Sequence, residues 1–438
     1  MEKVKVIGAG LAGCEAAWQL AQRGIPVELY EMKPQKMTPA HHSSDFAELV
    51  CSNSLRSDQL ENAVGLLKEE LRRMGSLIMA CADEHRVPAG GALAVDRFGF
   101  SSAVTEKIRS HPNITVVEEE VTAIPGEGNV IVASGPLTSD ALSGDIARHF
   151  PGEEYLHFFD AAAPIVTFES IDMDKAWFAS RYDRGTPDYI NCPMDKEQYE
   201  LFYNELVNAQ SADLHEFEKQ EFKVYEGCMP VEVMAKRGAD TLRYGPLKPV
   251  GLTDPHTGRR PWAVVQLRAE NREGTLYNLV GFQTNLKFPE QKRVFSLIPG
   301  LEHAEFVRYG VMHRNTFLNS PKLLTSAFCM KEHPDIYFAG QMTGVEGYVE
   351  SAASGILAGK NMARAILGKE PLLLPADCML GALSRYIADG SLHDFQPMGA
   401  NMGILPPWPE RVKDKTLRYE KIAERGLSHL KEYLEALD

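Results

Sequence analysis

The sequence predicts an α/β fold in which a split Rossmann-like domain is interrupted by a smaller α+β domain. Three observations support this prediction. The N-terminus follows a strand, glycine-rich turn, helix and strand pattern, two later segments pair a strand with glycines, and the charge pattern changes between them. We find no solenoid-length repeat and no low-complexity linker in the sequence. We therefore expect one discontinuous domain at residues 1–160 and 305–438, and an insertion domain at residues 161–304.

The first thirty residues have the order of elements that begins a dinucleotide-binding domain. Residues 4–7 are a β-branched run that predicts a buried strand, and residues 27–30 predict a second one. Between them lies a helical pattern that Gly24 ends. The first strand leads directly into Gly8, Ala9, Gly10, Leu11, Ala12 and Gly13. A glycine motif in this context, between a strand and a helix, is far more specific than the motif alone.

Each glycine of the motif has its own physical reason. Gly8 permits the tight turn, Gly10 lets the backbone approach a pyrophosphate, and Gly13 lets the helix pack close to the strand. The helix then points its free N–H groups at the phosphates. Glu31, 18 residues after Gly13, is expected to accept hydrogen bonds from a ribose hydroxyl. An acid at this position favours FAD or NAD over NADP.

Two later segments favour FAD. Residues 129–136 combine a strand with a glycine, and residues 336–341 form a strand that leads through Gly344 and Gly347 into a helix of small residues. This layout is typical of two-dinucleotide-binding flavoproteins, in which the second helix also points its N-terminus at the cofactor. The common version has Gly-Asp where this chain has Gly340 and Gln341, which points to a subfamily.

Composition and charge limit the remaining possibilities. The chain has 438 residues and a formal net charge of −14, which excludes a mini-protein and, as a first guess, argues against a nucleic-acid coat protein. Its seven cysteines are scattered without zinc-ligand spacing, so we expect reduced thiols and no metal site. The N-terminus does not resemble a secretory signal, and no apolar run is long enough to span a membrane. These features predict a soluble, cytoplasmic protein.

The acidic excess is unevenly distributed. Residues 195–226 contain nine Asp and Glu against three Lys in a helical pattern, whereas residues 234–268 contain seven Lys and Arg against two Asp. The second stretch also contains His256 and Trp262. A solvated loop explains it about as well as a phosphate-binding patch. Residues 411–421 predict a basic surface helix. Any nucleic-acid affinity should therefore rest on a limited basic patch and weaken as salt rises.

Three motifs resemble those of the folate- and FAD-dependent tRNA (uracil-5-)-methyltransferases, the TrmFO family. They are residues 48–57 (ELVCSNSLRS), residues 226–238 (EGCMPVEVMAKRG) and residues 340–348 (GQMTGVEGY). The resemblance extends over essentially the full length. The related glucose-inhibited-division protein A family, which modifies the tRNA wobble uridine, shares the fingerprint and the Gly-Gln element, but its members are considerably longer.

The resemblance implies a reaction and its cofactors. A methyl group derived from 5,10-methylenetetrahydrofolate is added to C5 of uridine 54 in the tRNA T-loop, reduced FAD supplies the electrons, and NAD(P)H recharges it. The one-carbon unit passes either through the flavin or directly from folate to uracil. The partners implied are tRNA, folate and NAD(P)H, with no membrane and no obligatory protein partner.

Two cysteines lie in these motifs. A thiolate is suited to adding at uracil C6, which makes C5 nucleophilic, and we predict that Cys228 does so. Lys236 and Arg237 would favour its ionised form if they fold back near it, whereas Glu226 would oppose it. Cys51 would be the second catalytic thiol, either as the base that removes the C5 proton or as a partner that protects or orients the first. The others are predicted to be buried hydrophobes: Cys14, Cys81, Cys192, Cys329 and Cys378.

Several further residues are candidates for the space around the flavin. The predicted cofactor-binding residues at the C-terminal element are Gly340, Gln341, Gly347 and Tyr348, with Thr343 beside them. Residues 313–315 and 89–97 are weaker candidates for flavin or folate contacts. Three alternatives stay open: a wobble-uridine modifier, a small-molecule flavin oxidoreductase, and a non-catalytic tRNA-binding flavoprotein.

Overall fold

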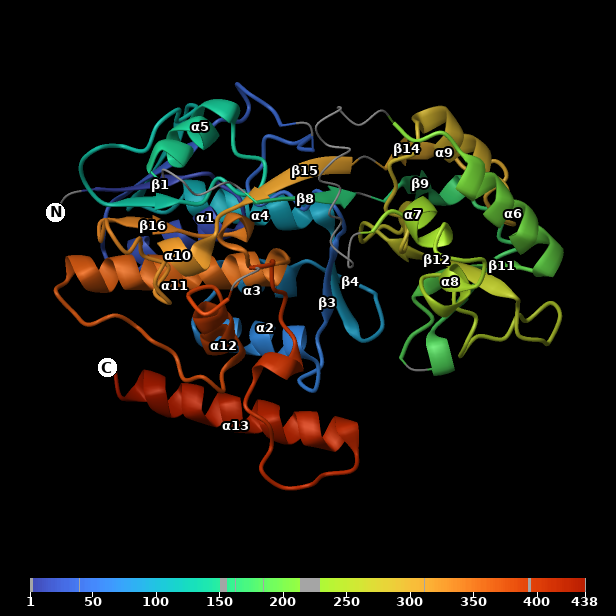
Figure 1. The fold of residues 1–438 in the computed structure, drawn as a ribbon. Coiled ribbons are helices and arrows are strands. Elements are labelled where there is room, and N and C mark those ends of the chain that lie inside the picture. The colour runs from blue at the N-terminus through green and yellow to red at the C-terminus, as the bar shows by residue number, and fades with distance from the viewer. Residues whose placement is uncertain are drawn as a thin grey trace.

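The computed structural model describes residues 3–38, 40–149, 156–161, 163–183, 185–212, 229–310, 312–392 and 395–437. Figure 1 shows two lobes, of which one contains both termini and the other is built from the middle of the chain. Between them lies the antiparallel pair β8 (Leu156–Ala161) and β15 (Met312–Phe317). No helix in these ranges combines the length and the apolar character needed to cross a bilayer.

The first lobe is organised around a five-stranded parallel sheet of order β16-β7-β1-β2-β6. Its strands are β1 (Val4–Ile7), β2 (Val27–Glu31), β6 (Ile114–Glu118), β7 (Val130–Val132) and β16 (Ile336–Phe338). β16 comes from the last third of the chain and pairs with β7 from the first third. The buried parallel strands and this return of the chain confirm the split Rossmann-like fold.

Helices and a small antiparallel sheet complete this lobe. The helices are α1 (Leu11–Ala21), α2 (Ala63–Arg73), α3 (Leu77–Glu84), α4 (Arg97–Arg109), α5 (Asp140–His149), α10 (Ser320–Leu323), α11 (Tyr348–Ile366), α12 (Met379–Tyr386) and α13 (Lys415–Glu435). The small sheet contains β3 (Ser54–Ser57), β4 (Arg86–Val87) and β5 (Ala92–Val95). The prediction of a helix from residue 411 was wrong at its start, because the Asp414 side chain caps α13 by accepting from the Leu417 N–H at 2.9 Å.

The second lobe contains a six-stranded antiparallel sheet of order β10-β11-β12-β13-β9-β14. Its strands are β9 (Ile165–Thr167), β10 (Trp177–Ala179), β11 (Tyr189–Met194), β12 (Ala263–Ala269), β13 (Leu276–Leu279) and β14 (Phe306–Arg308). Its helices are α6 (Lys196–Asn208), α7 (Val231–Ala235), α8 (Thr241–Tyr244) and α9 (Phe288–Phe295). Helix α6 turns Phe202 and Leu206 into the core and leaves Glu197 and Glu200 exposed, as predicted for the first part of residues 195–226, while residues 213–226 lie outside the described residues.

The cores of the two lobes are separate. One cluster of buried side chains is drawn from residues 4–146 and 317–430, and the other from residues 163–304. Strand β14 lies just beyond the predicted boundary at residue 305 yet pairs with β9 of the second sheet. The division into domains stays a prediction, and this pairing favours a boundary a few residues later.

Candidate active site

The glycine turn, residues 8–13, joins β1 to α1 as the spacing predicted. The Gly8 N–H donates to the Tyr30 carbonyl at 2.7 Å, and Gly8 has a φ of +100°, which disfavours a side chain. A Cβ at Gly13 would lie 1.8 Å from the Gly8 carbonyl oxygen. Close packing of the helix start on the turn therefore requires glycine at position 13.

Glu31 has a function within the protein that the sequence did not indicate. One of its carboxylate oxygens accepts the Ala9 N–H at 2.9 Å, and the other accepts the Lys33 N–H at 3.0 Å. The carboxylate therefore fixes the glycine turn against the end of β2. Its predicted contact with a ribose hydroxyl stays a prediction.

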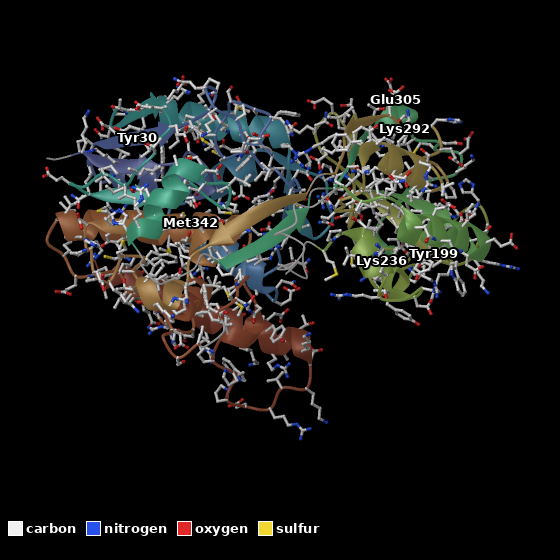
Figure 2. All side chains as sticks on the ribbon, turned by 45° about the horizontal axis from the view of Figure 1, so that its top comes forward. Tyr30, Tyr199, Lys236, Lys292, Glu305 and Met342 are labelled. Atoms are coloured by element: carbon white, nitrogen blue, oxygen red, sulfur yellow. The ribbon has the colours of Figure 1, made fainter. Side chains whose placement is uncertain are left out.

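A pocket with an empty volume of about 1110 Å³, open to solvent, follows the C-terminal edge of the parallel sheet. Its walls include most of the predicted cofactor-binding residues: Gly8, Ala9, Gly10, Leu11, Ala12, Glu31, Gly340, Gln341 and Tyr348. Among the described residues, no atom beyond its chain neighbours lies within 4 Å of the position that a Cβ on Gly10 would take, so the backbone faces open space there. A pocket over the N-terminus of α1 fits a dinucleotide such as FAD. Figure 2 labels Tyr30, which lines this pocket from β2.

The C-terminal element closes the other side of the pocket. The Gly340 N–H donates to the Ser354 hydroxyl at 2.7 Å, which ties the end of β16 to α11. The Gln341 side chain donates to Glu346 at 2.9 Å, so this glutamine orders the turn that precedes α11. Tyr348 is the first residue of α11.

Beside this pocket lies the Cys51 loop, which we define as residues 47–57. Two of its non-glycine residues have left-handed backbone conformations, Ala47 with φ +51° and Arg56 with φ +63°. Such conformations persist only where surrounding contacts impose them. Cys51 itself is half-buried. The N–H groups of Cys51 and Ser52 both donate to the Tyr348 hydroxyl oxygen, at 2.6 and 3.3 Å.

Arginines from three elements hold the first half of the loop. The Arg97 guanidinium donates to the Leu49 carbonyl, and the Arg308 guanidinium donates to the Val50 carbonyl. The third, Arg268 of β12, donates to the Ser52 hydroxyl at 2.7 Å and to the side-chain oxygen of buried Asn53 at 2.9 Å. This contact corrects the sequence interpretation of Arg268, which was counted in the basic surface stretch but is buried.

A lysine holds the second half of the loop. Fully buried Lys68 of α2 donates to the carbonyls of Leu55, Arg56 and Ser57, at 2.7, 3.1 and 2.5 Å. Burial lowers the pKa of Lys68 to about 8. Three successive carbonyls thus satisfy the three protons of one ammonium group.

These cations make the surroundings of the Cys51 loop electropositive. Burial opposes the charge of Arg97, but Glu270 at 2.8 Å outweighs burial and raises the pKa of Arg97. Burial and the neighbouring Arg97 charge lower the pKa of Arg308, while Tyr348 and Cys51 act in the opposite direction. A negative charge that develops on a base bound near these guanidinium groups would be stabilised by them.

Some of the predicted site residues lie close together in the structure, and others lie outside the described residues. Cys51 contacts Tyr348 through its backbone N–H, and Tyr348 and Gln341 both line the pocket. Cys228 lies outside the described residues, as do the side chains of residues 313–315. The five cysteines predicted to be structural are buried, as expected. No cluster of three or more metal-ligating side chains occurs in the part of the chain that the structure describes.

Four residues that support the Cys51 loop were missed or underestimated by sequence reasoning. Arg97 ends the segment 89–97, which was singled out only for flavin or folate contacts. Lys68, Glu270 and Arg308 carried no signal at all, because charged residues in a helix or strand pattern, such as those of segment 68–73, are normally expected on the surface. Their function depends on contacts over 11 to 258 residues of sequence, which periodicity does not encode.

The chain is similar in sequence to a known family and in fold to solved structures. The family model described as "Glucose inhibited division protein A" matches residues 3–370. The chain is 64% identical over 437 residues to the methylenetetrahydrofolate–tRNA-(uracil-5-)-methyltransferase TrmFO of Acetivibrio thermocellus, covering 99% of each chain. It is 63% identical over 433 residues to the enzyme of the same name from Desulforamulus reducens, covering 99% of this chain and 98% of the relative. Among solved structures, GidA of Aquifex aeolicus shares the fold with a TM-score of 0.69 at 17% identity, over 99% of this chain and 75% of that one.

Proposed function

This chain belongs to the TrmFO family of methylenetetrahydrofolate–tRNA-(uracil-5-)-methyltransferases, and from that premise we propose what its site does. It transfers a one-carbon unit from 5,10-methylenetetrahydrofolate to C5 of a uracil in tRNA. The target is uridine 54 of the T-loop. The single observation that carries this proposal is the full-length identity of 58–64% to enzymes of that name.

We propose that FAD binds in the pocket of the first lobe. The glycine turn and the start of α1 would hold its pyrophosphate, and the C-terminal element would lie at its other end. FAD, when bound and reduced, supplies the electrons for the transfer. We propose NAD(P)H as the source of those electrons, a cytoplasmic location, and activity without an obligatory protein partner.

We assign the thiol chemistry to two cysteines. Cys51 follows Val50, which lines the pocket, and lies near Arg97, Arg268 and Arg308, whose charges would stabilise negative charge developing on a bound base. It would act as the base toward the C5 proton or as the partner of the nucleophile. Cys228, the proposed nucleophile at C6, stays assigned by its motif.

We propose that tRNA approaches over the exposed basic face of the second lobe that follows Cys228. Lys236, Lys248, Arg259 and Arg260 are exposed there, and the Arg243 guanidinium lies 3.6 Å from the centre of the Trp262 ring. Cations of this kind bind a phosphate backbone by releasing counterions, and an exposed aromatic ring such as that of Tyr244 can stack on an unpaired base.

A pair of lysines tests this surface. Figure 2 shows Lys236 and Lys292 at opposite ends of the second lobe, and both are exposed. Lys236→Ser should weaken tRNA binding and reduce the slope of log K against log salt by about 1, whereas Lys292→Ser should leave both unchanged. Filter binding between 50 and 200 mM salt measures the slope. Equal effects of the two substitutions would contradict the assignment of the surface.

The reaction is tested with the FAD-loaded protein, unmodified tRNA, labelled methylenetetrahydrofolate and NADPH. Nucleoside analysis should recover the label as 5-methyluridine from the T-loop, and Cys51→Ala and Cys228→Ala should both abolish it. A T-loop containing 5-fluorouracil should trap a covalent adduct that Cys228→Ala removes. Label at the wobble position, or NADPH oxidation that does not depend on tRNA and cysteine, would overturn the proposed function.

A further inference from the structure

The peptide group that joins Val50 to Cys51 is held at both of its polar ends. Its carbonyl oxygen accepts from the Arg308 guanidinium, and its N–H donates to the Tyr348 hydroxyl oxygen at 2.6 Å. A peptide group is planar, so fixing its oxygen and its hydrogen fixes the orientation of the whole plane. The plane in turn sets the direction in which the chain enters Cys51.

The two groups that hold this peptide come from different lobes. Arg308 ends β14, which is part of the antiparallel sheet of the second lobe, and Tyr348 begins α11 of the first lobe. Both side chains bind the same peptide group of the Cys51 loop, one at each end. The orientation of Cys51 therefore depends on how the two lobes are docked.

The adjacent peptide groups make the arrangement stiffer on both sides. The next N–H, on Ser52, also donates to Tyr348, at 3.3 Å, and the preceding carbonyl, on Leu49, accepts from Arg97. Tyr348 also lines the pocket beside Gln341 and Ser351. A single side chain thus touches both the pocket and the backbone of the cysteine.

The contact of Arg308 is not explained by stability alone. Among the described residues Arg308 forms no direct ion pair, although the charge of Glu270 reaches it, and its buried Nε has no hydrogen-bond acceptor there. Removing part of a guanidinium from water without a directly paired carboxylate is costly. The position of Arg308 is more readily explained by its hydrogen bond to the Val50 carbonyl, which holds that carbonyl in place.

We propose that Arg308 and Tyr348 act together as positioning residues that orient the Cys51 side chain, one from each lobe. The proposal rests on the proposed function of Cys51 as a catalytic thiol. Neither residue makes or breaks a bond in the reaction, since both act through the Val50–Cys51 peptide. Cys51 is then correctly placed only when the second lobe is docked on the first.

The test compares FAD-loaded Tyr348→Phe, Arg308→Gln and the double variant. Tyr348→Phe keeps the ring in the pocket wall and removes only the oxygen that accepts the two N–H groups. Two matched controls remove similar contacts elsewhere: Tyr386→Phe, whose hydroxyl donates to the Gln396 carbonyl at 2.7 Å, and Arg385→Gln, whose guanidinium donates to the Leu374 carbonyl at 3.2 Å. The readouts are flavin content, kcat, KM for tRNA, and the rate at which iodoacetamide alkylates Cys51, followed by peptide mass spectrometry.

We expect each single variant to lower kcat by about 100-fold with KM for tRNA and flavin content unchanged, because a small misplacement of a catalytic group has effects of that size. Alkylation of Cys51 should become several-fold faster in Tyr348→Phe, since the half-buried thiol gains freedom. The double variant should be no worse than the poorer single variant, because releasing either end releases the peptide. Arg308→Lys should recover part of kcat, since an ammonium can still donate to the Val50 carbonyl.

Several outcomes would overturn the proposal. The first is a rate of Cys51 alkylation and a kcat that both stay within two-fold of the wild type in Tyr348→Phe. The second is a loss of kcat in the double variant that equals the product of the two single losses. The third is a loss of kcat in the two control variants as large as in the test variants. Altered alkylation with unchanged methylation would support the positioning and overturn the catalytic function of Cys51. Retained methylation in Cys51→Ala would overturn that function independently.

Discussion

The glycine turn and the Cys51 loop lie on the same pocket but are held in place by different means. The turn at residues 8–13 is fixed mainly by its own backbone and by Tyr30 and Glu31, within 23 residues of sequence, and its Ala9 carbonyl also accepts the Ala47 N–H at 2.9 Å. The Cys51 loop is fixed by cationic side chains from α2, α4, β12 and β14, and by Tyr348 of α11. The difference teaches that the predicted cofactor turn is encoded mainly by nearby residues, whereas the placement of the proposed catalytic thiol depends on elements from both lobes.

The largest effect is expected in the glycine turn, from Gly13→Ala. The added Cβ would lie 1.8 Å from the Gly8 carbonyl oxygen, so the helix start must move away from the turn. We expect FAD affinity to fall at least about 100-fold and the melting temperature to drop, because overpacking at backbone contacts is not relieved by rotamer changes. Flavin absorbance after gel filtration and thermal unfolding measure the two effects.

Two other glycines serve as controls for this prediction. Gly144→Ala on α5 adds a Cβ with no atom within 4 Å and should leave FAD content and melting temperature unchanged. Gly10→Ala also meets no protein atom, so it should fold normally and lose FAD alone. Normal FAD content in Gly13→Ala would contradict the view that the turn is specified by its own packing.

The next largest effect is expected in the Cys51 loop, from Arg268→Met. The substitution leaves the buried side-chain oxygen of Asn53 without its donor and removes one of the two donors of the Ser52 hydroxyl, which keeps the Ser54 N–H. We expect kcat to fall about 100-fold while flavin content stays normal, because the loop moves and the glycine turn does not. The surface control Arg293→Met, in the same lobe, removes ion pairs at 45% exposure and should retain full activity. If Arg268→Met lost flavin as well as kcat, the Cys51 loop and the glycine turn would not be held in place independently.

The same contrast explains what the sequence could predict. The parallel sheet, the glycine turn and the return of β16 beside β7 followed from local patterns, and the structure has them. Cys51 was found from its motif, but Lys68 and Arg308 were not, because a charged residue in a helix or strand usually faces solvent. The same expectation placed Arg268 on the surface, where it is not. Only the packing of the two lobes makes these cations neighbours of one loop.

A smaller effect, on stability and with a defined pH dependence, is expected from Lys68→Met. Removing the ammonium leaves three carbonyls without this donor, of which that of Leu55 is buried, and this should lower the free energy of unfolding by about 2–3 kcal/mol at pH 7. Burial lowers the pKa of Lys68 in the folded protein to about 8, from its ordinary value of 10.5. Between these values the unfolded chain binds more protons, so the contribution of this group to stability rises with pH.

The difference in unfolding free energy between the wild type and Lys68→Met should therefore widen by up to about 3 kcal/mol from pH 8 to pH 10.5. Urea unfolding at several pH values measures it, and titrations elsewhere cancel in the difference. Lys107→Met, which removes a surface lysine paired with Glu84, provides the control and should show no such widening. A difference that stays constant or narrows as pH rises would contradict the burial of a charged Lys68.

The smallest effect is expected from Ala47→Gly at the start of the Cys51 loop. Ala47 already has a left-handed φ of +51°, so glycine relieves strain there but adds freedom to the unfolded chain and removes a buried methyl group. These contributions nearly cancel, and the free energy of unfolding should fall by less than about 1 kcal/mol. A loop held by its own backbone, as the glycine turn is, would loosen and lose activity when given a glycine. The Cys51 loop is instead held by side chains, namely Arg97, Arg268, Arg308, Lys68 and Tyr348, so the variant should keep kcat within two-fold of the wild type. Steady-state methylation measures kcat, and a ten-fold loss would show that the backbone of this loop, too, determines where Cys51 lies.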